Sequence, residues 1–252
     1  MEESAERVKK LLILGATSGI AQAYVNLVAE RFENIVLVAR SKEKLESLAD
    51  HVRTIADAKV ATLVSDLSDT SEHQNMLTSV LETMGGIDCV LVSYGELTDQ
   101  SLCLTDPIYA LEQFNLNGTS TISLSMGIAN QLALQGGGTL AVVGSVAGDR
   151  GRRSNYCYGA AKSAVDSFLA GLRSEMQQHK VHVLTIKPGF VDTPMTSSFK
   201  KGALWASADK VASDIDNAIV KRKNVLYTPW FWRYIMLVIK CIPEFIFKKL
   251  PL

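Results

Sequence analysis

The sequence predicts an α/β domain in which helices cover both faces of a doubly wound parallel sheet of about seven strands. Three observations support this. Short apolar runs alternate with longer segments of helical periodicity along most of the chain. These runs are continuous rather than alternating with polar residues, which is typical of strands that are buried on both faces. The 252 residues suffice for one such domain with a sizeable core.

Strands and helices are expected to follow one another in regular order. The apolar runs predict strands at 10–14, 35–39, 60–64, 88–93, 139–144, 181–187 and 224–227. Helices are expected at about 19–32, 41–56, 70–84, 106–135, 155–179 and 207–221. Right-handed crossovers would bring the loops after the strands to one edge of the sheet, where ligands bind. Residues 1–228 would form this domain, followed by an apolar and basic tail at 229–252.

A glycine-containing turn joins the first strand to the first helix. It reads Gly-Ala-Thr-Ser-Gly-Ile-Ala over residues 15–21. In Rossmann-like sheets, such a turn presents backbone N–H groups and a helix N-terminus to a pyrophosphate. Taken alone, the turn also fits an ordinary loop between a strand and a helix. The candidate cofactor contacts within it are Gly15, Thr17, Ser18, Gly19 and Ile20.

Tyr158 and Lys162 form a candidate proton-transfer pair. They are four residues apart, so they share one helix face and the ammonium can lie beside the phenol. A nearby cation favours the charged form of tyrosine, whose pKa is ordinarily about 10. Such a phenol can exchange a proton with a carbonyl oxygen or an alcohol. Ser145 follows an apolar run and could hold the substrate oxygen, although an isolated pair of this spacing is more often a solvated helix face.

In combination, these motifs resemble those of the short-chain dehydrogenase/reductase family up to about residue 229. The matching residues, in the order typical of that family, are the glycine turn, Asp66, Asn115, Ser145, Tyr158, Lys162 and Pro188-Gly189. The resemblance implies that Tyr158 is the general acid/base and that Lys162 binds the nicotinamide ribose and lowers the phenol pKa. Ser145 would orient the carbonyl. Asn115, which the Asn-Leu-x-Gly frame favours over Asn117, would hold a water in a proton relay.

The same resemblance implies a loop over the nicotinamide, and paired long helices that make a homo-oligomer. Its further cofactor contacts would be Gly95, Pro188, Gly189, Val191 and Thr193. One departure is the segment Ser93-Tyr94-Gly95, where the family usually has Asn-Ala-Gly. Gly95 keeps the close approach to the cofactor, whereas the bulky Tyr94 is expected to alter the local packing.

The end of the second strand bears on the choice of cofactor. An acidic residue there would bind a ribose 2′-hydroxyl, but the sequence reads Arg40-Ser41-Lys42. Arg40 can place its guanidinium on a 2′-phosphate, so NADP(H) is favoured and NAD(H) remains an alternative. A solvated arginine at the start of a helix is the other interpretation. Asp66 and Leu67, after the third strand, would meet the adenine ring.

Composition narrows the function classes. Lysine plus arginine equal aspartate plus glutamate at 26 each, so bulk charge predicts no nucleic-acid partner. The four cysteines form no Cys-x-x-Cys pair, so we expect a reduced intracellular setting and no metal. The first seven residues are polar and acidic, unlike a signal peptide. The expected location is cytoplasmic, or peripheral at the inner face of the cell membrane.

The tail is unusually apolar between Pro229 and Pro243. Thirteen helical residues would span about 20 Å, which is short of the roughly 30 Å hydrocarbon core of a membrane. Its tryptophans and lysines suit a helix lying in the membrane interface. A helix that closes the domain core or a dimer interface fits a wide apolar face equally well.

Three arginines between Ser145 and Tyr158 are candidate contacts for a substrate phosphate: Arg150, Arg152 and Arg153. A solvated loop or an interface salt bridge is the alternative for any one of them. The segment 195–206, with small residues and Lys200-Lys201, could be a lid. Together with the tail, the arginines predict a phosphate-bearing lipid substrate.

Residues 148–158, and above all the tail, resemble the decaprenylphosphoryl-2-keto-pentose reductases. That resemblance implies hydride delivery to C2 of a polyprenylphosphoryl keto sugar, which yields the arabinose donor for cell-wall arabinan. A flavin-dependent oxidase would be the functional partner. The first alternative is a reductase of another hydrophobic ketone, a steroid or an acyl thioester. The second is a non-catalytic NADP-binding scaffold, which would bind cofactor without transferring hydride.

Overall fold

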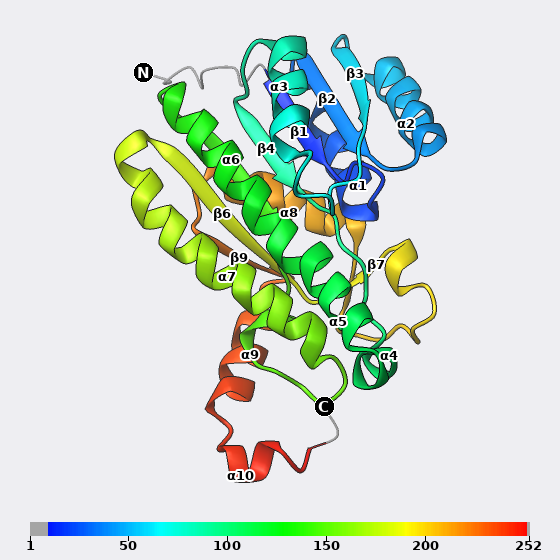
Figure 1. Ribbon diagram of the computed structural model, residues 1–252, viewed down its shortest axis with the longest axis vertical. Coiled ribbons are helices and arrows are strands. Elements are labelled where there is room, and N and C mark those ends of the chain that lie inside the picture. Colours follow the sequence, from blue (N-terminus) through cyan, green and yellow to red (C-terminus); the bar gives the residue numbers. More distant parts are fainter. Residues whose placement is uncertain (1–9, 251–252) are drawn as a thin grey trace.

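A seven-stranded parallel sheet forms the centre of the computed structural model, which describes residues 10–250 (Figure 1). The polar start, predicted not to be a signal peptide, lies outside the described residues. The strand order is β3-β2-β1-β4-β5-β6-β9, which confirms the doubly wound topology. The strands are β1 (Lys10–Leu14), β2 (Asn34–Ala39), β3 (Lys59–Val64), β4 (Cys89–Val92), β5 (Gly138–Val143), β6 (Val181–Pro188) and β9 (Val225–Thr228). The seven predicted strands are therefore confirmed to within one residue at each end.

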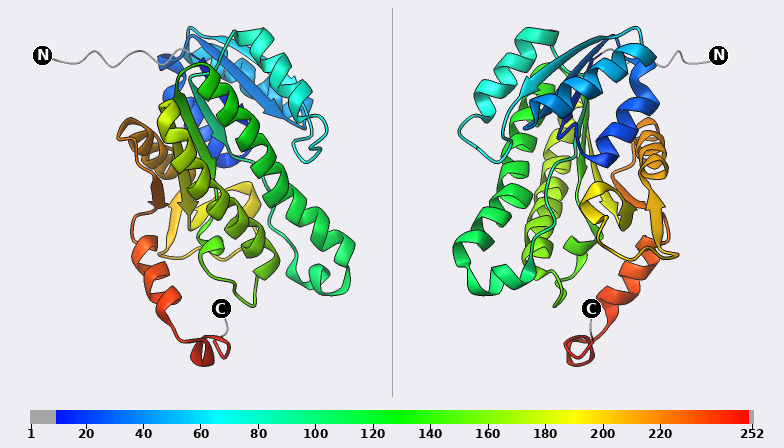
Figure 2. Two further views of the ribbon diagram at one scale, coloured as in Figure 1. Left: turned by 60° about the vertical axis from the view of Figure 1, so that its left-hand side comes forward. Right: turned by 90° about the vertical axis from the view of Figure 1, so that its right-hand side faces the viewer.

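Helices pack on both faces of this sheet (Figure 2). One face carries α1 (Gly19–Val28), α2 (Lys42–Ile55) and α8 (Ala208–Val220). The other carries α3 (His73–Met84), α6 (Ser120–Leu134) and α7 (Tyr156–Met176). Successive side chains of a strand point to opposite faces. Leu11 and Ile13 of β1 therefore enter the first core, and Leu12 and Leu14 enter the second.

The long helix predicted at 106–135 is divided in the structure. It consists of α5 (Pro107–Phe114), a π-helical turn at Asn115–Thr119 and then α6, and a short helix α4 (Gln100–Thr105) precedes it. Asp106 starts α5 by accepting hydrogen bonds from the backbone N–H groups of Ile108 and Tyr109. Pro107 occupies the first helical turn, where it needs no hydrogen-bond partner. Single π-helical turns of this kind occur frequently at functional sites.

Two smaller units lie beyond β6. A two-stranded parallel sheet pairs β7 (Phe190–Asp192) with β8 (Trp205–Ser207). The tail forms α9 (Trp232–Cys241) and α10 (Glu244–Phe247), which extend from one end of the molecule in both views of Figure 2. Trp232 and Met236, four residues apart, pack against Val146, so one face of α9 closes onto the domain. The predicted thirteen-residue helix is shorter, and its inner face is part of the fold.

Candidate active site

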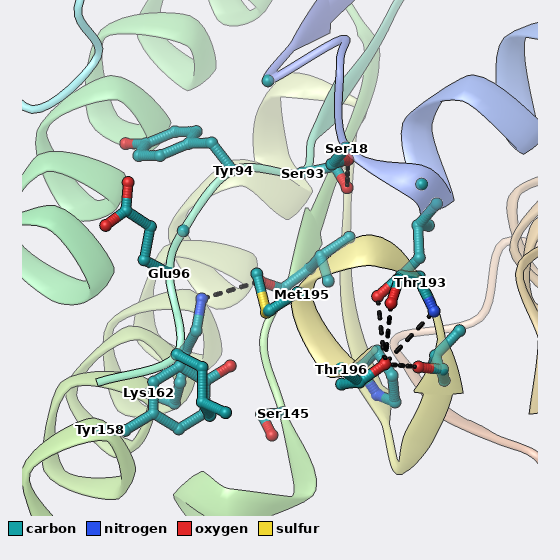
Figure 3. Close-up of a pocket in the computed structure, with 18 of the residues that line it drawn as sticks. Ser18, Ser93, Tyr94, Glu96, Ser145, Tyr158, Lys162, Thr193, Met195 and Thr196 are labelled. Carbon is teal, nitrogen blue, oxygen red and sulfur yellow. Dashed lines mark hydrogen bonds between the residues drawn. The ribbon is translucent and has the colours of Figure 1, made fainter. Parts of the chain in front are cut away.

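One cavity of about 610 Å³ runs along the carboxyl ends of the strands. Figure 3 draws part of its wall, with Tyr158, Lys162 and Ser145 on one side and Ser18 with Ser93 on another. The predicted site residues that line it are Gly15, Thr17, Ser18, Gly19, Ile20, Arg40, Asp66, Leu67, Gly95, Ser145, Arg152, Tyr158, Lys162, Pro188, Gly189, Val191 and Thr193. Asn115, Arg150 and Arg153 lie outside this wall.

The glycine turn is held in a conformation that only glycine adopts easily. Gly15 has φ +78°, and a Cβ there would lie 2.6 Å from the Cβ of Tyr94. Ser18 caps α1 by accepting a hydrogen bond from the Ala21 backbone N–H at 3.2 Å. Its hydroxyl also lies 2.9 Å from that of Ser93, so the residue in the family's asparagine position is tied to the turn. Gly19 and Ile20, at the start of α1, line the cavity.

The loop after β6 packs against the glycine turn. A Cβ on Gly19 would lie 2.9 Å from Cγ2 of Thr193, so Gly19 permits close contact between the two segments. Thr196 donates its hydroxyl to the Val191 carbonyl at 2.6 Å and accepts from the Thr193 backbone N–H at 3.2 Å (Figure 3). Met195, between them, lines the cavity. The start of the predicted lid therefore covers the middle of the site.

The far end of the cavity carries charge. Nη2 of Arg40 lies 2.5 Å from Oε1 of Glu96, which comes from the loop after β4. Oδ1 of Asp66 accepts hydrogen bonds from the backbone N–H and the hydroxyl of Ser68, at 3.0 and 2.8 Å. These bonds, the backbone one first, lower the pKa of the Asp66 carboxyl. Glu96 was not predicted as a site residue, because nothing in the local sequence pairs it with Arg40.

Tyr158 and Lys162 meet Ser145 at the other end. Nζ of Lys162 lies 5.7 Å from the centre of the Tyr158 ring and donates to the Val143 carbonyl at 3.3 Å. Lys162 is 2 % exposed. Ser145 starts a 3₁₀ turn, where its hydroxyl accepts the Ala147 backbone N–H at 3.1 Å. The helix α7 and the end of β5 thus bring the proton-transfer pair and the serine into one corner.

Burial controls the ionisation of this pair. It raises the pKa of the Tyr158 phenol to about 12, although a hydrogen bond with Ser145 acts in the opposite direction. It lowers the pKa of Lys162 to about 8, while the Asp166 carboxylate raises it. The expectation that Lys162 lowers the phenol pKa stays a prediction, because burial, Ser145 and Asp166 are the influences that shift the Tyr158 pKa here. A phenol that keeps its proton suits the donor role of a reduction.

The two candidate asparagines make different contacts. The side-chain amide of Asn115 donates to the Ser68 carbonyl at 2.8 Å. Asn117 is fully buried, and its Oδ1 accepts the Glu96 backbone N–H at 3.0 Å. A Cβ on Gly95 would lie 2.7 Å from Asn117 Oδ1 and 3.6 Å from Lys162 Nζ. Both Asn117 and Lys162 thus lie close to Gly95, whereas neither asparagine lines the cavity, so the relay role of Asn115 stays a prediction.

The three arginines predicted to bind a substrate phosphate differ in their contacts. Nη1 of Arg150 donates to the carbonyls of Ile239 and Ile242, each at 2.6 Å. Its guanidinium also lies 3.6 Å from the centre of the Phe247 ring and pairs with Glu244. The prediction of Arg150 as a phosphate contact is therefore wrong: it satisfies the carbonyls at the end of α9.

Arg152 and Arg153 differ although they are adjacent. Arg153 is exposed and does not line the cavity, so its predicted role has no support from its position. Arg152 is partly buried and contributes to the cavity wall. Its burial lowers the pKa of the guanidinium, against the influence of Asp149. Only Arg152 of the predicted three faces the site.

Sequence reasoning missed Trp232, which the tail brings into the cavity wall. A Cβ on Gly189 would lie 1.9 Å from Nε1 of Trp232, so the absence of a side chain at Gly189 lets the indole lie directly on the backbone. Phe190 meets the same indole edge to face, with ring centres 5.3 Å apart. The four-residue spacing of Trp232 and Met236 was the available signal for an inward face.

Comparison with known proteins agrees with this geometry. A family model described as short chain dehydrogenase matches residues 9–203. An uncharacterized oxidoreductase of Mycobacterium tuberculosis is 31 % identical over 217 residues, covering 86 % of this chain and 87 % of that protein. Another from Streptomyces coelicolor is 30 % identical over 243 residues, covering 96 % of each chain.

Solved structures share the fold. A short-chain dehydrogenase from Sphingobium yanoikuyae, in complex with NADPH, has a TM-score of 0.82 at 21 % identity, covering 96 % of each chain. A short chain dehydrogenase from Burkholderia cenocepacia, in complex with NADP, has a TM-score of 0.81 at 17 % identity, covering 95 % of this chain and 96 % of that one. At these identities the likeness concerns the fold.

Proposed function

We propose that this chain, which belongs to the short-chain dehydrogenase family of oxidoreductases, is an NADPH-dependent reductase of a polyprenylphosphoryl 2-keto-pentose. The observation that carries the reductase part is the corner formed by Ser145, Tyr158 and Lys162 in the same cavity as the glycine turn. The product would be the corresponding arabinose donor, and a flavin-dependent oxidase would supply the keto substrate.

The residues of the cavity fit a phosphorylated dinucleotide. The turn at Gly15 and the capped start of α1 offer backbone N–H groups to a pyrophosphate. Arg40 offers a guanidinium for a 2′-phosphate, and no acidic residue stands at the end of β2 in the described chain. The relatives of known structure named above were solved with NADP or NADPH, which supports NADPH over NADH. Bound NADPH would supply the hydride.

The protein's own residues would handle the oxygen and the proton. Ser145 would donate a hydrogen bond to the ketone oxygen and hold the carbonyl in place. As the carbonyl carbon accepts hydride, Tyr158 would give its phenolic proton to that oxygen, forming the alcohol. The Lys162 ammonium would stabilise the tyrosinate that this leaves. Asn115, with Asn117 as the alternative, would hold the water of the relay that returns a proton from solvent.

The substrate class rests on Arg152 and on the tail. Arg152 is a guanidinium in the cavity wall, seven residues after Ser145, and such a group is well shaped for a phosphate oxygen. The tail sequence resembles that of the decaprenylphosphoryl-2-keto-pentose reductases. A polyprenyl chain would leave the cavity on the side of α9, whose outer face is apolar.

The tail is proposed to contact the membrane surface. Trp230, Tyr234 and Val238 are 60–69 % exposed, and lysines at 240, 248 and 249 lie on the same exposed tail. Aromatic side chains at headgroup level and lysines on phosphates are typical of interfacial helices. None of the helices within residues 10–250 is long and apolar enough to span a membrane. The location would then be peripheral, at the cytoplasmic face.

A homo-oligomer is part of the proposal. Ile108, Leu111 and Met126, on α5 and α6, are 47–71 % exposed. Apolar faces of this kind on long helices are suited to pairing with a second copy. The pairing would leave the tail free at the end of the molecule.

A second candidate is the reduction of another hydrophobic ketone. Leu97, Phe190 and Phe199 line the cavity and are themselves 38–47 % exposed, so its mouth is largely apolar. Such a mouth would accept a steroid or acyl thioester as readily as a prenyl chain. The two candidates differ in their need for a phosphate.

The deciding experiment is NADPH oxidation with a short-chain prenylphosphoryl 2-keto-pentose produced in place by a flavin oxidase. Arg152→Ala should raise the KM for that substrate at least about tenfold, since hydrogen bonds to charged groups contribute about 1.5–3 kcal/mol. Arg153→Ala, the matched control, should leave the KM unchanged. Equal turnover of soluble ketones by wild type and Arg152→Ala, with none of the lipid-linked sugar, would support the second candidate instead.

A further inference from the structure

The indole of Trp232 is buried but its polar atom is unpaired. Trp232 is 3 % exposed, and its Nε1 has no hydrogen-bond partner within residues 10–250. The same residue lines the cavity. A buried tryptophan N–H usually finds an acceptor, and leaving a buried donor unsatisfied costs about 1–3 kcal/mol. The position of this N–H therefore points to an acceptor that enters the cavity.

Trp232 lies beside the turn that begins at Ser145. Its ring packs against Val146, the residue after Ser145. Its Nε1 is the atom that a Cβ on Gly189 would meet first, at 1.9 Å. The indole N–H is thus held between the turn that carries Ser145 and the loop after β6.

Two other polar atoms of the same wall share this property. Nε of Arg152 and Oδ1 of Asn155 are buried and have no partner among the described residues. Both residues line the cavity, and the Asn155 backbone N–H donates to the Arg152 carbonyl at 3.1 Å, so they sit on one turn. The segment between Ser145 and Tyr158 therefore offers a charged donor and an amide, and the tail adds the indole donor. An amide has both a donor and an acceptor end, so either orientation of Asn155 keeps this set.

We propose that Trp232, Asn155 and Arg152 form a subsite for an oxygen-rich substrate. Trp232 donates to the oxygen of the hydroxyl next to the reduced carbonyl, Asn155 pairs with a neighbouring hydroxyl, and Arg152 binds the anionic group. This assignment rests on the proposed keto-sugar reductase and specifies how the sugar is held. It makes the tail part of the substrate site as well as a membrane contact.

The subsite explains how a cavity with an apolar mouth could reject simple ketones. A site built to hydrogen-bond a substrate hydroxyl discriminates against an analogue that lacks it, because its buried polar groups then stay unpaired. A steroid or plain ketone would leave the polar groups of Trp232 and Asn155 without hydrogen-bond partners. A hydroxylated ketone would satisfy them.

The test compares Trp232→Phe with Trp230→Phe. Phenylalanine keeps an aromatic ring at 232 but removes the indole N–H together with part of the ring, and Trp230→Phe, at a position that is 69 % exposed, is the matched control for that change. The probes are a short-chain prenylphosphoryl 2-keto-pentose and its 3-deoxy counterpart. Trp232→Phe should raise the KM for the hydroxylated probe about 3- to 10-fold, as expected for one neutral hydrogen bond. The KM for the deoxy probe and the Kd for NADPH should not change, and Trp230→Phe should match wild type.

Other results would overturn the assignment. A larger Kd for NADPH in Trp232→Phe would mean that the indole binds the cofactor, and equal losses with both probes would mean a packing role. Asn155→Ala supplies a second variant if Trp232→Phe does not fold, with the same selective loss expected.

If wild type turns over neither probe, the proposed function fails separately from the subsite. Calorimetric binding of the two probes to the NADP⁺ complex then decides the subsite. Preference for the hydroxylated probe that disappears in Trp232→Phe would uphold it, and absence of that preference or of any binding would overturn it.

Discussion

The Arg40 guanidinium and the Glu96 carboxylate form an ion pair across the end of the cavity, with Nη2 2.5 Å from Oε1. Both side chains are about half exposed, at 58 % and 45 %, so water screens the pair and its contribution to stability is small. Its importance lies in competition: the guanidinium that would take a 2′-phosphate already has an anionic partner. We therefore expect Glu96 to affect the preference between the two nicotinamide cofactors.

Neutralising Glu96 should strengthen NADPH binding. In Glu96→Gln, Arg40 loses its competing anion, and the Kd for NADPH should fall about 2- to 5-fold, the range of an exposed pair. The Kd for NADH, which lacks the phosphate, should stay the same. Arg40→Ala is the control for the opposite effect: it should raise the Kd for NADPH by about tenfold or more and leave the Kd for NADH unchanged. If Arg40→Ala changes the Kd values for NADPH and NADH equally, as measured by cofactor fluorescence, Arg40 does not recognise the 2′-phosphate.

The pH dependence of the reduction should report Lys162. Below pH about 8 the lysine is charged, and Tyr158, with its pKa raised to about 12, is protonated, which is the combination that a reduction needs. As pH rises, the lysine loses its proton first because its pKa is depressed. The kcat/KM for NADPH, which follows the free enzyme, should be level at neutral pH and decline above about 8. A decline that begins only near pH 10 would contradict this ordering.

Gly189→Ala should displace the tail from the active site. The added methyl group would lie 1.9 Å from Nε1 of Trp232, so either the loop or α9 must move. Overpacking of this kind costs about 1–3 kcal/mol, which urea unfolding can measure. Activity should fall with it. Gly171→Ala, where nothing lies within 4 Å, should instead gain about 0.5–1 kcal/mol as a helical position. Equal stability of the two variants would refute the contact.

Arg150→Ala should loosen the tail rather than remove a phosphate contact. Its guanidinium bonds the Ile239 and Ile242 carbonyls and is only 15 % exposed, so its loss should lower the unfolding free energy by about 1–3 kcal/mol. Chymotrypsin should then cut the tail faster than in wild type or Arg153→Ala. A raised substrate KM with stability and proteolysis unchanged would restore the phosphate role.

Local sequence patterns were sufficient to predict the strands of the sheet, the glycine turn and the Tyr158–Lys162 pair. Continuous apolar runs specify buried parallel strands. The turn at Gly15 directly follows its strand, and Tyr158 and Lys162 are four residues apart on one helix, so both motifs can be read from a few neighbouring residues. Such local units keep their geometry in the fold. The order of the strands then follows from the crossover rule.

The features that the sequence did not predict depend mostly on contacts between segments that are far apart in the chain. Arg150 reaches the end of α9, about ninety residues later, and no local feature marks it as a structural arginine. The π-helical turn at Asn115–Thr119 cannot be recognised from a plain helical pattern. The pKa of Tyr158 depends on burial, which charge spacing cannot give. Trp232 was treated as a membrane residue because its partner, Gly189, lies on another element.

The most direct test of the reductase is NADPH oxidation with the prenylphosphoryl 2-keto-pentose by Tyr158→Phe and Tyr156→Phe. Tyr156 is on the same helix, two residues earlier, and is 41 % exposed, so it controls for the loss of a hydroxyl from α7. We expect Tyr158→Phe to bind NADPH as wild type does and to lose at least about a hundredfold in kcat, as for a missing general acid. Tyr156→Phe should remain active. Full activity in Tyr158→Phe would contradict the account at its centre.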